Sequence, residues 1–179
     1  MFEDLLVGLA RELDAAEVPY MVIGGQAVLL YGEPRLTADV DVTLGIAPDR
    51  LPDVLGVVER LGLHPLVEPE RFVSETLVLP CSDSADERRV DFVFSFAGYE
   101  RAAIARATTV EIQGTQVRFA SAEDLVILKL VAGRPRDVED VRGILLRQPG
   151  LDAGTVRQWL AEFDAALGME TVRLFDSLR

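Results

Sequence analysis

The spacing of hydrophobic residues changes several times along the chain, and each change predicts an element. Apolar residues recur every three to four positions, as in helices that bury one face, over residues 2–16, 48–61, 137–146, 155–167 and 171–178 and from residue 121 onward. Runs of β-branched and aromatic residues, several of them alternating with polar ones, predict strands at residues 20–23, 38–44, 71–79, 88–96, 109–112 and 116–119. Short helices are predicted at residues 26–31 and 98–107, and a loop at 80–87. This order predicts an α/β (α+β) fold, in which helices flank a mixed, twisted β-sheet.

One weak boundary interrupts this pattern near the C-terminus. The residues Gln148, Pro149 and Gly150 favour a turn, so we expect a main domain at residues 1–148 and a helical extension at residues 149–179. Aromatic and leucine residues anchor these last helices on the main domain or on a sister chain, which makes a homodimer a candidate assembly.

The stretch of residues 21–44 carries the most informative pattern. The strand at residues 20–23 stops at Gly24 and Gly25, where the absence of a Cβ allows a tight turn and close approach of a ligand. The helix that follows, from Gln26, begins with unpaired backbone N–H groups that suit a phosphate.

The next strand in this stretch carries two acids on one face. Residues 38–44 alternate strictly, so Asp39 and Asp41 point to the same side, roughly 7 Å apart at Cα. Two such carboxylates repel each other unless a cation lies between them, and paired oxygen ligands suit Mg²⁺ with substrate phosphates. This pair is therefore a candidate metal site.

A third acid, Asp91, lies on the polar-facing side of the strand at residues 88–96. Its neighbours Val90 and Phe92 face the other side. Two interpretations stay open from the pattern alone. Asp91 is either a third ligand of the metal site or an edge residue whose charge Arg89 balances.

The residues Gly24, Gly25, Gln26 and Ala27, then Arg35, Thr37 and the Asp39-Val40-Asp41 triplet, resemble the signature of the DNA polymerase β-like nucleotidyltransferase superfamily. Within it the chain is similar to the small AbiEii-type nucleotidyltransferases of toxin-antitoxin systems. It differs from the minimal nucleotidyltransferases that pair with HEPN proteins, because Gly25 replaces their serine. The resemblance implies a nucleotidyltransferase fold and makes Asp91 the third metal-site carboxylate.

The resemblance also implies roles around the carboxylates. Asp39 and Asp41 would bridge two Mg²⁺ ions, with Mn²⁺ as an alternative, while Asp91 would hold the nucleophile-side ion. The nucleotide would be bound by Gly24, Gly25, Gln26, Lys129, Arg134 and Arg136, and the carboxylates would be supported by Arg35 and Thr37. The alternatives without a functional role are that Lys129 is a solvated surface residue and that Arg35 pairs with Glu33. We interpret Asp137 and Asp140 as structural, since acids in a first helical turn offset the helix dipole or pair with Arg136 and Arg142.

Composition and charge limit the partners and the kinds of metal site that the chain can have. The formal net charge is −12, with 30 acidic and 18 basic residues, so nucleic acid is repelled at long range unless a local basic patch or a partner captures it. One cysteine and one histidine, Cys81 and His64, exclude an internal disulfide and a Cys/His metal cluster. No apolar run approaches the length of a membrane span, and we expect a cytoplasmic protein.

Three functional hypotheses follow. The first is a Mg²⁺-dependent nucleotidyltransferase that moves an NMP from an NTP such as ATP to a hydroxyl of tRNA, a protein or a small molecule. The second is a non-catalytic toxin or antitoxin partner that keeps the fold, against which the three intact acids argue. The third is a metal-dependent phosphohydrolase, although the chain lacks the histidine ligands common in such sites.

Overall fold

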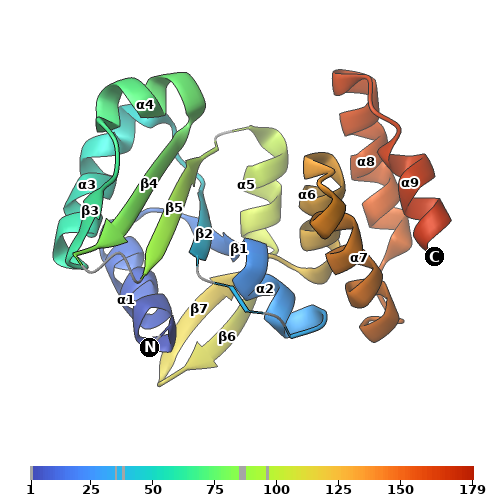
Figure 1. The fold of residues 1–179 in the computed structure, drawn as a ribbon, viewed down its shortest axis with the longest axis horizontal. Coiled ribbons are helices and arrows are strands. Elements are labelled where there is room, and N and C mark those ends of the chain that lie inside the picture. The colour runs from blue at the N-terminus through green and yellow to red at the C-terminus, as the bar shows by residue number, and fades with distance from the viewer. Residues whose placement is uncertain (1, 35, 38, 85–87, 96) are drawn as a thin grey trace. The chain divides into compact units, whose positions relative to one another are not determined.

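The computed structural model describes residues 2–34, 36–37, 39–84, 88–95 and 97–179. The chain forms two compact units: Met1–Gln26 with Leu36–Phe119, and Ala27–Arg35 with Ala120–Arg179. The first unit contains the sheet and the second is helical (Figure 1). The compact units divide at residues 26 and 27, at 35 and 36 and at 119 and 120, and the predicted extension at residues 149–179 lies within the second unit.

The first unit is built on a seven-stranded sheet. Its strands, in spatial order, are β3 (Leu63–Pro65), β4 (Val78–Asp83), β5 (Arg89–Phe94), β2 (Asp39–Leu44), β1 (Tyr20–Ile23), β7 (Thr115–Phe119) and β6 (Thr108–Ile112). The pairs β2–β5 and β1–β7 are parallel and the other pairs are antiparallel. The prediction of a mixed sheet flanked by helices is therefore confirmed.

Helices of the first unit bury their apolar stripes against this sheet and against one another. They are α1 (Phe2–Ala15), α3 (Leu51–Arg60), which follows a short 3-10 turn at Pro48–Arg50, α4 (Pro69–Thr76), α5 (Gly98–Ala105) and the start of α2 (Gly24–Tyr31). Leu9 and Leu13 of α1 and Val54 of α3 are fully buried, since α1 packs on α3 and β7. This packing covers the apolar side chains of the sheet and leaves the ends of β2 and β5 to carry polar groups.

One predicted strand is wrong. Residues 71–77 belong to helix α4 and the adjoining turn, although their composition favours a strand. Local capping decides the outcome: Pro69 opens the helix, and the Glu68 side chain accepts a hydrogen bond from the backbone N–H of Arg71. Leu77 closes it in the left-handed conformation. The strand instead covers Val78–Asp83, so the predicted loop at 80–87 begins inside β4, and the short strand β3 was not predicted.

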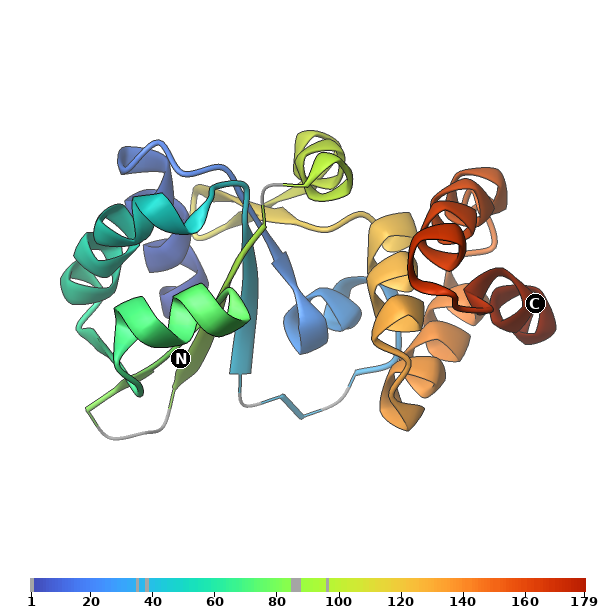
Figure 2. The ribbon, with the colours of Figure 1, turned by 90° about the horizontal axis from the view of Figure 1, so that it is seen from above.

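The second unit is a helical cluster around α6. Besides the end of α2, it contains α6 (Ala122–Ala132), α7 (Pro135–Arg147), α8 (Ala153–Leu167) and α9 (Thr171–Leu178). Helix α6 packs on α7, α8 and α9, as Figures 1 and 2 show. Ser121 caps α6 as predicted, since its hydroxyl accepts a hydrogen bond from the Asp124 backbone N–H at 3.1 Å. None of the described helices is long and apolar enough to cross a membrane.

Candidate active site

Three carboxylates share one face of the sheet, on two neighbouring strands of the first unit. Strand β2 carries Asp39 and Asp41, and strand β5 carries Asp91. Because β2 and β5 are parallel and in register, Asp41 lies directly beside Asp91. Side chains at matching positions of paired strands point to the same face. The structure therefore brings the three predicted acids together at the beginning of both strands.

The opposite face of these strands explains why the acids point as they do. Val40 and Val42 of β2 pair with Val90 and Phe92 of β5, and all four side chains are fully buried. A one-residue shift of either strand would place carboxylates in this apolar core, at a large desolvation cost. The alternation thus fixes both the register and the side on which the acids lie, and that side is partly open to solvent.

Electrostatics couple two of the acids. Burial, followed by the negative charge of Asp39, raises the pKa of Asp91 above its ordinary value of 3.8, and Arg89 opposes this shift. Burial and the charge of Asp91 also raise the pKa of the Cys81 thiol to about 12. The site therefore concentrates negative charge, which a cation would relieve, and Cys81 stays a neutral thiol rather than a ligand.

The donor chemistry fits a hard divalent cation. Carboxylate oxygens are the ligands that Mg²⁺ prefers, and like charges on adjacent strands favour a bridging ion. Among the described residues, however, no three His, Cys, Asp or Glu side chains converge closely enough to hold one ion as they stand. Coordination by all three aspartates therefore requires their side chains to turn toward a common point.

The diglycine bend lies against one of these acids. Gly24 has a φ of +64°, and a Cβ at this position would lie 1.8 Å from Asp41 Oδ2. Helix α2 begins at Gly24 itself, two residues earlier than predicted, and the Gln26 side chain is buried. The backbone N–H groups of a helix start thus lie beside Asp41, which is the arrangement that the sequence predicted for phosphate binding. Contact of these three residues with a nucleotide stays a prediction.

Thr37 holds the segment that leads into β2. Its hydroxyl donates a hydrogen bond to the backbone carbonyl of Asp39 at 3.3 Å. This bond fixes the backbone rather than the carboxylate, so the support that Thr37 gives to Asp39 is through the main chain. Arg35, the other predicted supporting residue, lies outside the described residues.

Lys129 lies in the second unit and is buried, not solvated. Its Nζ lies 2.8 Å from Asp137 Oδ1 and 2.7 Å from Asp140 Oδ2, and its side chain is 6% exposed. Helix α6 buries residues on every side, because α7, α8 and α9 surround it, and this is why the position of Lys129 off the apolar stripe does not expose it. The predicted role of Lys129 at the nucleotide stays untested, but the structure gives its ammonium group two carboxylate partners.

Asp137 and Asp140, which we interpreted as structural, form buried ion pairs with Lys129, a partner that the sequence did not predict. Arg134 Nε lies 2.6 Å from Asp137 Oδ2, and Lys129 binds both acids. Burial would raise the pKa of Asp137, but hydrogen bonds from Arg134 and Lys129 outweigh it and lower that pKa. The period of one helix did not show this cluster, because Lys129 lies on α6 and both acids lie on α7.

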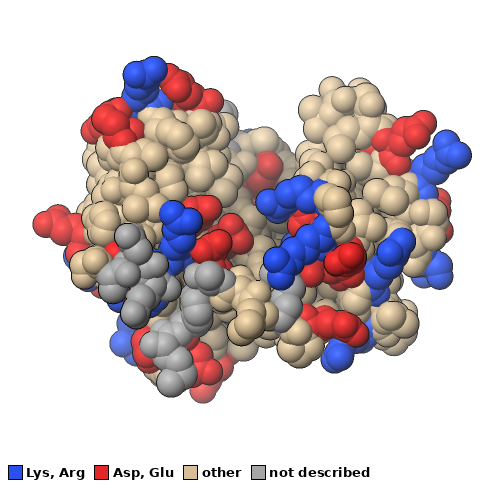
Figure 3. Space-filling model, in the orientation of Figure 1, with Lys and Arg blue, Asp and Glu red and all other residues tan. Residues whose placement is uncertain are grey.

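The two predicted arginines remain on the surface of the second unit. The side chain of Arg134 is 76% exposed, and Arg136 is also exposed. Residues 129–147 contain five basic and three acidic residues, in contrast to the acidic chain as a whole. Figure 3 shows basic side chains gathered around α6 and α7 on the face that it presents. This segment therefore has more basic than acidic residues, although Lys129 and Arg134 are already paired with carboxylates.

Comparisons with known proteins agree with this fold. No curated protein sequence matches the chain. Among solved structures, the antibiotic-resistance factor ANT(2'')-Ia in solution has a TM-score of 0.62 and 21% identity, over 93% of this chain and 92% of that chain. The same factor in complex with adenylyl-2''-tobramycin gives a TM-score of 0.61 and 22% identity, over 92% and 97% of the two chains.

Two further structures support the same fold. An antigenic nucleotidyltransferase-like protein from Paracoccidioides brasiliensis has a TM-score of 0.58 and 18% identity, over 93% of this chain and 88% of that chain. The lincosamide antibiotic adenylyltransferase LnuA, bound to lincomycin, has a TM-score of 0.50 and 14% identity, over 74% and 89%. A family model described as a nucleotidyltransferase of unknown function (DUF6036) matches residues 2–176. Since this match spans almost the whole sequence, the chain belongs to this nucleotidyltransferase family.

Proposed function

We propose that the protein is a Mg²⁺-dependent nucleotidyltransferase that moves an NMP from an NTP to a hydroxyl group and releases pyrophosphate. The observation that carries this proposal is the register of β2 and β5, which sets Asp41 beside Asp91 on the face that also carries Asp39. Gly24 supports it, because the start of α2 lies against Asp41 where phosphates would bind.

Each of the three acids has its own role in this proposal. Asp39 and Asp41 would hold two Mg²⁺ ions, and Asp91 would hold the ion on the nucleophile side. Bound Mg²⁺, or Mn²⁺ in its place, supplies activation of the attacking hydroxyl and neutralises charge on the departing pyrophosphate. The hydroxyl oxygen bonds to the α-phosphorus as the bond to the β-phosphate oxygen breaks. Asp91 would also accept the hydroxyl proton.

The nucleotide would lie against the start of α2. Gly24, Gly25 and Gln26 would offer backbone N–H groups to its phosphates. Arg134 and Arg136, which are exposed, would neutralise charge on the triphosphate. A direct contact from Lys129 requires two ion pairs to break, so we assign it an indirect role through Asp137, which holds Arg134.

The acceptor in this proposal is a small molecule, a protein or tRNA. Support for a small molecule comes from the neighbours, since one was solved with adenylyl-2''-tobramycin and another with lincomycin. The adenylyl group of the first also favours ATP as the donor. The net charge of −12 disfavours nucleic acid unless a basic segment captures it.

A second candidate function is that of a toxin or antitoxin component, as the AbiEii-type resemblance implies. In its non-catalytic form the protein would bind a cognate partner without turnover. Three like charges on one sheet face argue against this form, because they destabilise the fold unless they serve to bind cations. We include a cytoplasmic location in the proposal, since NTP and Mg²⁺ are available in the cytoplasm. A homodimer is also part of the proposal.

The test is incubation of the full chain with each α-labelled NTP, Mg²⁺ or Mn²⁺, and tRNA, cell lysate or an aminoglycoside as acceptor. We expect label on an acceptor and pyrophosphate in solution, both lost in Asp39→Ala and Asp41→Ala. Glu75→Ala, which removes an exposed acid of α4, is the charge-matched control and should keep activity. Release of phosphate without pyrophosphate would identify a phosphohydrolase, and absence of turnover with tight partner binding would identify the non-catalytic form.

A further inference from the structure

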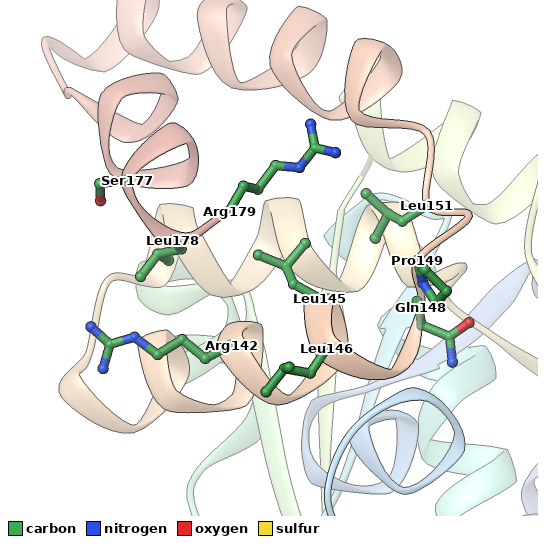
Figure 4. Close-up of a pocket in the computed structure, with 9 residues that line it drawn as sticks. All are labelled: Arg142, Leu145, Leu146, Gln148, Pro149, Leu151, Ser177, Leu178 and Arg179. Carbon is green, nitrogen blue, oxygen red and sulfur yellow. The ribbon is translucent and has the colours of Figure 1, made fainter.

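A groove of the second unit has an apolar floor, and the charged side chains that line it, among the described residues, are basic. Its volume is about 420 Å³, and it lies between the end of α7, the loop that follows and the end of α9 (Figure 4). Leu145, Leu151 and Leu178 line it, and Figure 4 shows Leu145 and Leu178 between the two arginines Arg142 and Arg179. Within the part of the chain that the structure describes, its lining includes no Asp or Glu side chain.

One leucine at this groove extends into solvent. Leu146 has a relative exposure of 81%, whereas most large apolar residues of the described chain are buried. An exposed leucine that adjoins a leucine-lined groove is an apolar patch with a polar rim, which is the composition of a protein interface. Burial of this patch would stabilise a complex, and nothing in the nucleotidyltransferase chemistry uses it.

We infer that this groove binds an acidic, amphipathic segment of a partner protein. Arg142 is exposed, so its guanidinium group is accessible to a carboxylate of the partner. Leucines on one face of the segment would contact Leu145, Leu146 and Leu178, as in helix-in-groove recognition. Acids that flank them would face Arg142 and Arg179.

The exposure of Leu146 decides between a protein segment and a small ligand. Sites for small molecules bury most of the surface of the ligand, and their walls are themselves largely shielded. A wall residue that is 81% exposed cannot enclose such a molecule, but a protein segment laid along α7 and α9 would cover it.

Charge also decides against a symmetric dimer through this groove. In an isologous interface the same patch meets itself, so Arg142 and Arg179 of both copies would converge. Like charges that face each other in a desolvated contact repel and disfavour such a dimer. The groove therefore fits a different, acidic surface.

The test uses a fluorescein-labelled, end-capped peptide of about 15 residues, roughly four helical turns, with leucines at i, i+3, i+4 and i+7 and glutamates elsewhere. Its binding to the full chain is followed by fluorescence anisotropy without NTP or metal, so the result is independent of nucleotidyl transfer. A peptide with lysines in place of the glutamates is the charge control. We expect the acidic peptide to bind roughly tenfold or more tightly than the basic one.

Substitutions inside and outside the groove test where the peptide binds. Leu146→Ser and Arg142→Glu should each weaken binding of the acidic peptide roughly tenfold or more. Leu167→Ser, at an exposed leucine of α8 outside the groove, and Arg173→Glu, at an exposed arginine of α9, should change it less than about twofold. Equal binding of both peptides, or equal affinity of Leu146→Ser and wild type, overturns the inference. Sedimentation that shows a dimer dissociated by Leu146→Ser also overturns it, because the occupant is then a second copy.

Discussion

The carboxylate of Asp41 occupies the space that a Cβ on Gly24 would need. Such a Cβ would lie 1.8 Å from Asp41 Oδ2 and 2.7 Å from its Cγ, far inside van der Waals contact. Gly24 also has a φ of +64°, which L side chains rarely adopt. Two independent constraints therefore reserve this position for glycine, and one of them ties the bend before α2 directly to the candidate metal site.

Gly24→Ala should therefore abolish nucleotidyl transfer while the protein stays folded. The new methyl group must displace the Asp41 side chain, and the backbone strain adds about 1–2 kcal/mol. We expect transfer to fall about 100-fold or more, and the midpoint of thermal unfolding to fall by a few degrees. Gly150→Ala is the control, because its Cβ would meet nothing within 4 Å. Transfer by Gly24→Ala at the wild-type rate would show that the position of Asp41 is irrelevant.

Asp91→Asn should stabilise the protein at pH 7 while it removes activity. Burial and the charge of Asp39 raise the pKa of Asp91 above 3.8, so its ionised form disfavours the folded state. This penalty is present above the raised folded pKa and disappears as the pH falls through it toward 3.8. Calorimetry should therefore show Asp91→Asn melting above wild type at pH 7, with the gap closing at lower pH.

Asp53→Asn, at an exposed acid of α3, controls for the loss of one negative charge. It should keep transfer activity, whereas Asp91→Asn should lose about 100-fold or more. Exposed charges of this kind change stability by about 0.5 kcal/mol or less. A gap between Asp91→Asn and wild type that widens as the pH falls would contradict the electrostatic account of this site.

The sequence predicts the position of a site residue well where one strand determines its environment. It predicts that position poorly where several elements determine it together. Strict alternation placed Asp39 and Asp41 on one face, and the register of β2 with β5 confirms that Asp91 shares it. The alternation at β5 was as clear, because Val90, Phe92 and Phe94 are all in the core. Because every second residue of this strand is apolar, one orientation of the strand buries that whole face.

The wrong predictions concern residues whose structure depends on helix caps or on packing against other elements. Residues 71–77 have a strand-like composition, but Glu68 and Pro69 cap a helix, and the exposed pair Arg71 and Glu75 lies at helical spacing. Lys129 lay off the expected apolar stripe of α6, yet three helices surround α6 and Asp137 and Asp140 neutralise its charge. Neither the surrounding helices nor such a cluster can be read from the period of one helix.

Lys129→Met should destabilise the second unit strongly. It leaves Asp137 and Asp140 buried without their shared cation, and loss of one partner in a buried pair costs about 3–5 kcal/mol. Combining Lys129→Met with Asp137→Asn and Asp140→Asn should recover much of this loss, because the buried negative charges that Lys129 balanced are then removed. The free energy of unfolding in urea measures both variants, and Arg173→Ala at an exposed arginine is the control.

The pH dependence of this cluster has the opposite sign to that of Asp91. The pKa of Asp137 is lowered by Arg134 and Lys129 against the effect of burial, so its ionised form stabilises the folded state. That contribution is complete above the ordinary value of 3.8 and is lost as the pH falls through the lowered pKa. Acid unfolding of Asp137→Asn should therefore depend less on pH in this range than acid unfolding of wild type.

Divalent cations should stabilise the wild-type protein through its three acids, even without nucleotide. Binding to the folded state alone adds RT ln(1 + [L]/Kd) to stability, which is about 1.4 kcal/mol at roughly ten times Kd. For a chain of this size that raises the unfolding midpoint by about 3–6 °C. Mn²⁺ and Mg²⁺ should give this shift, EDTA should reverse it, and Asp39→Ala and Asp91→Asn should not show it. Glu75→Ala should show it in full, and an equal shift in Asp39→Ala would place the cation elsewhere.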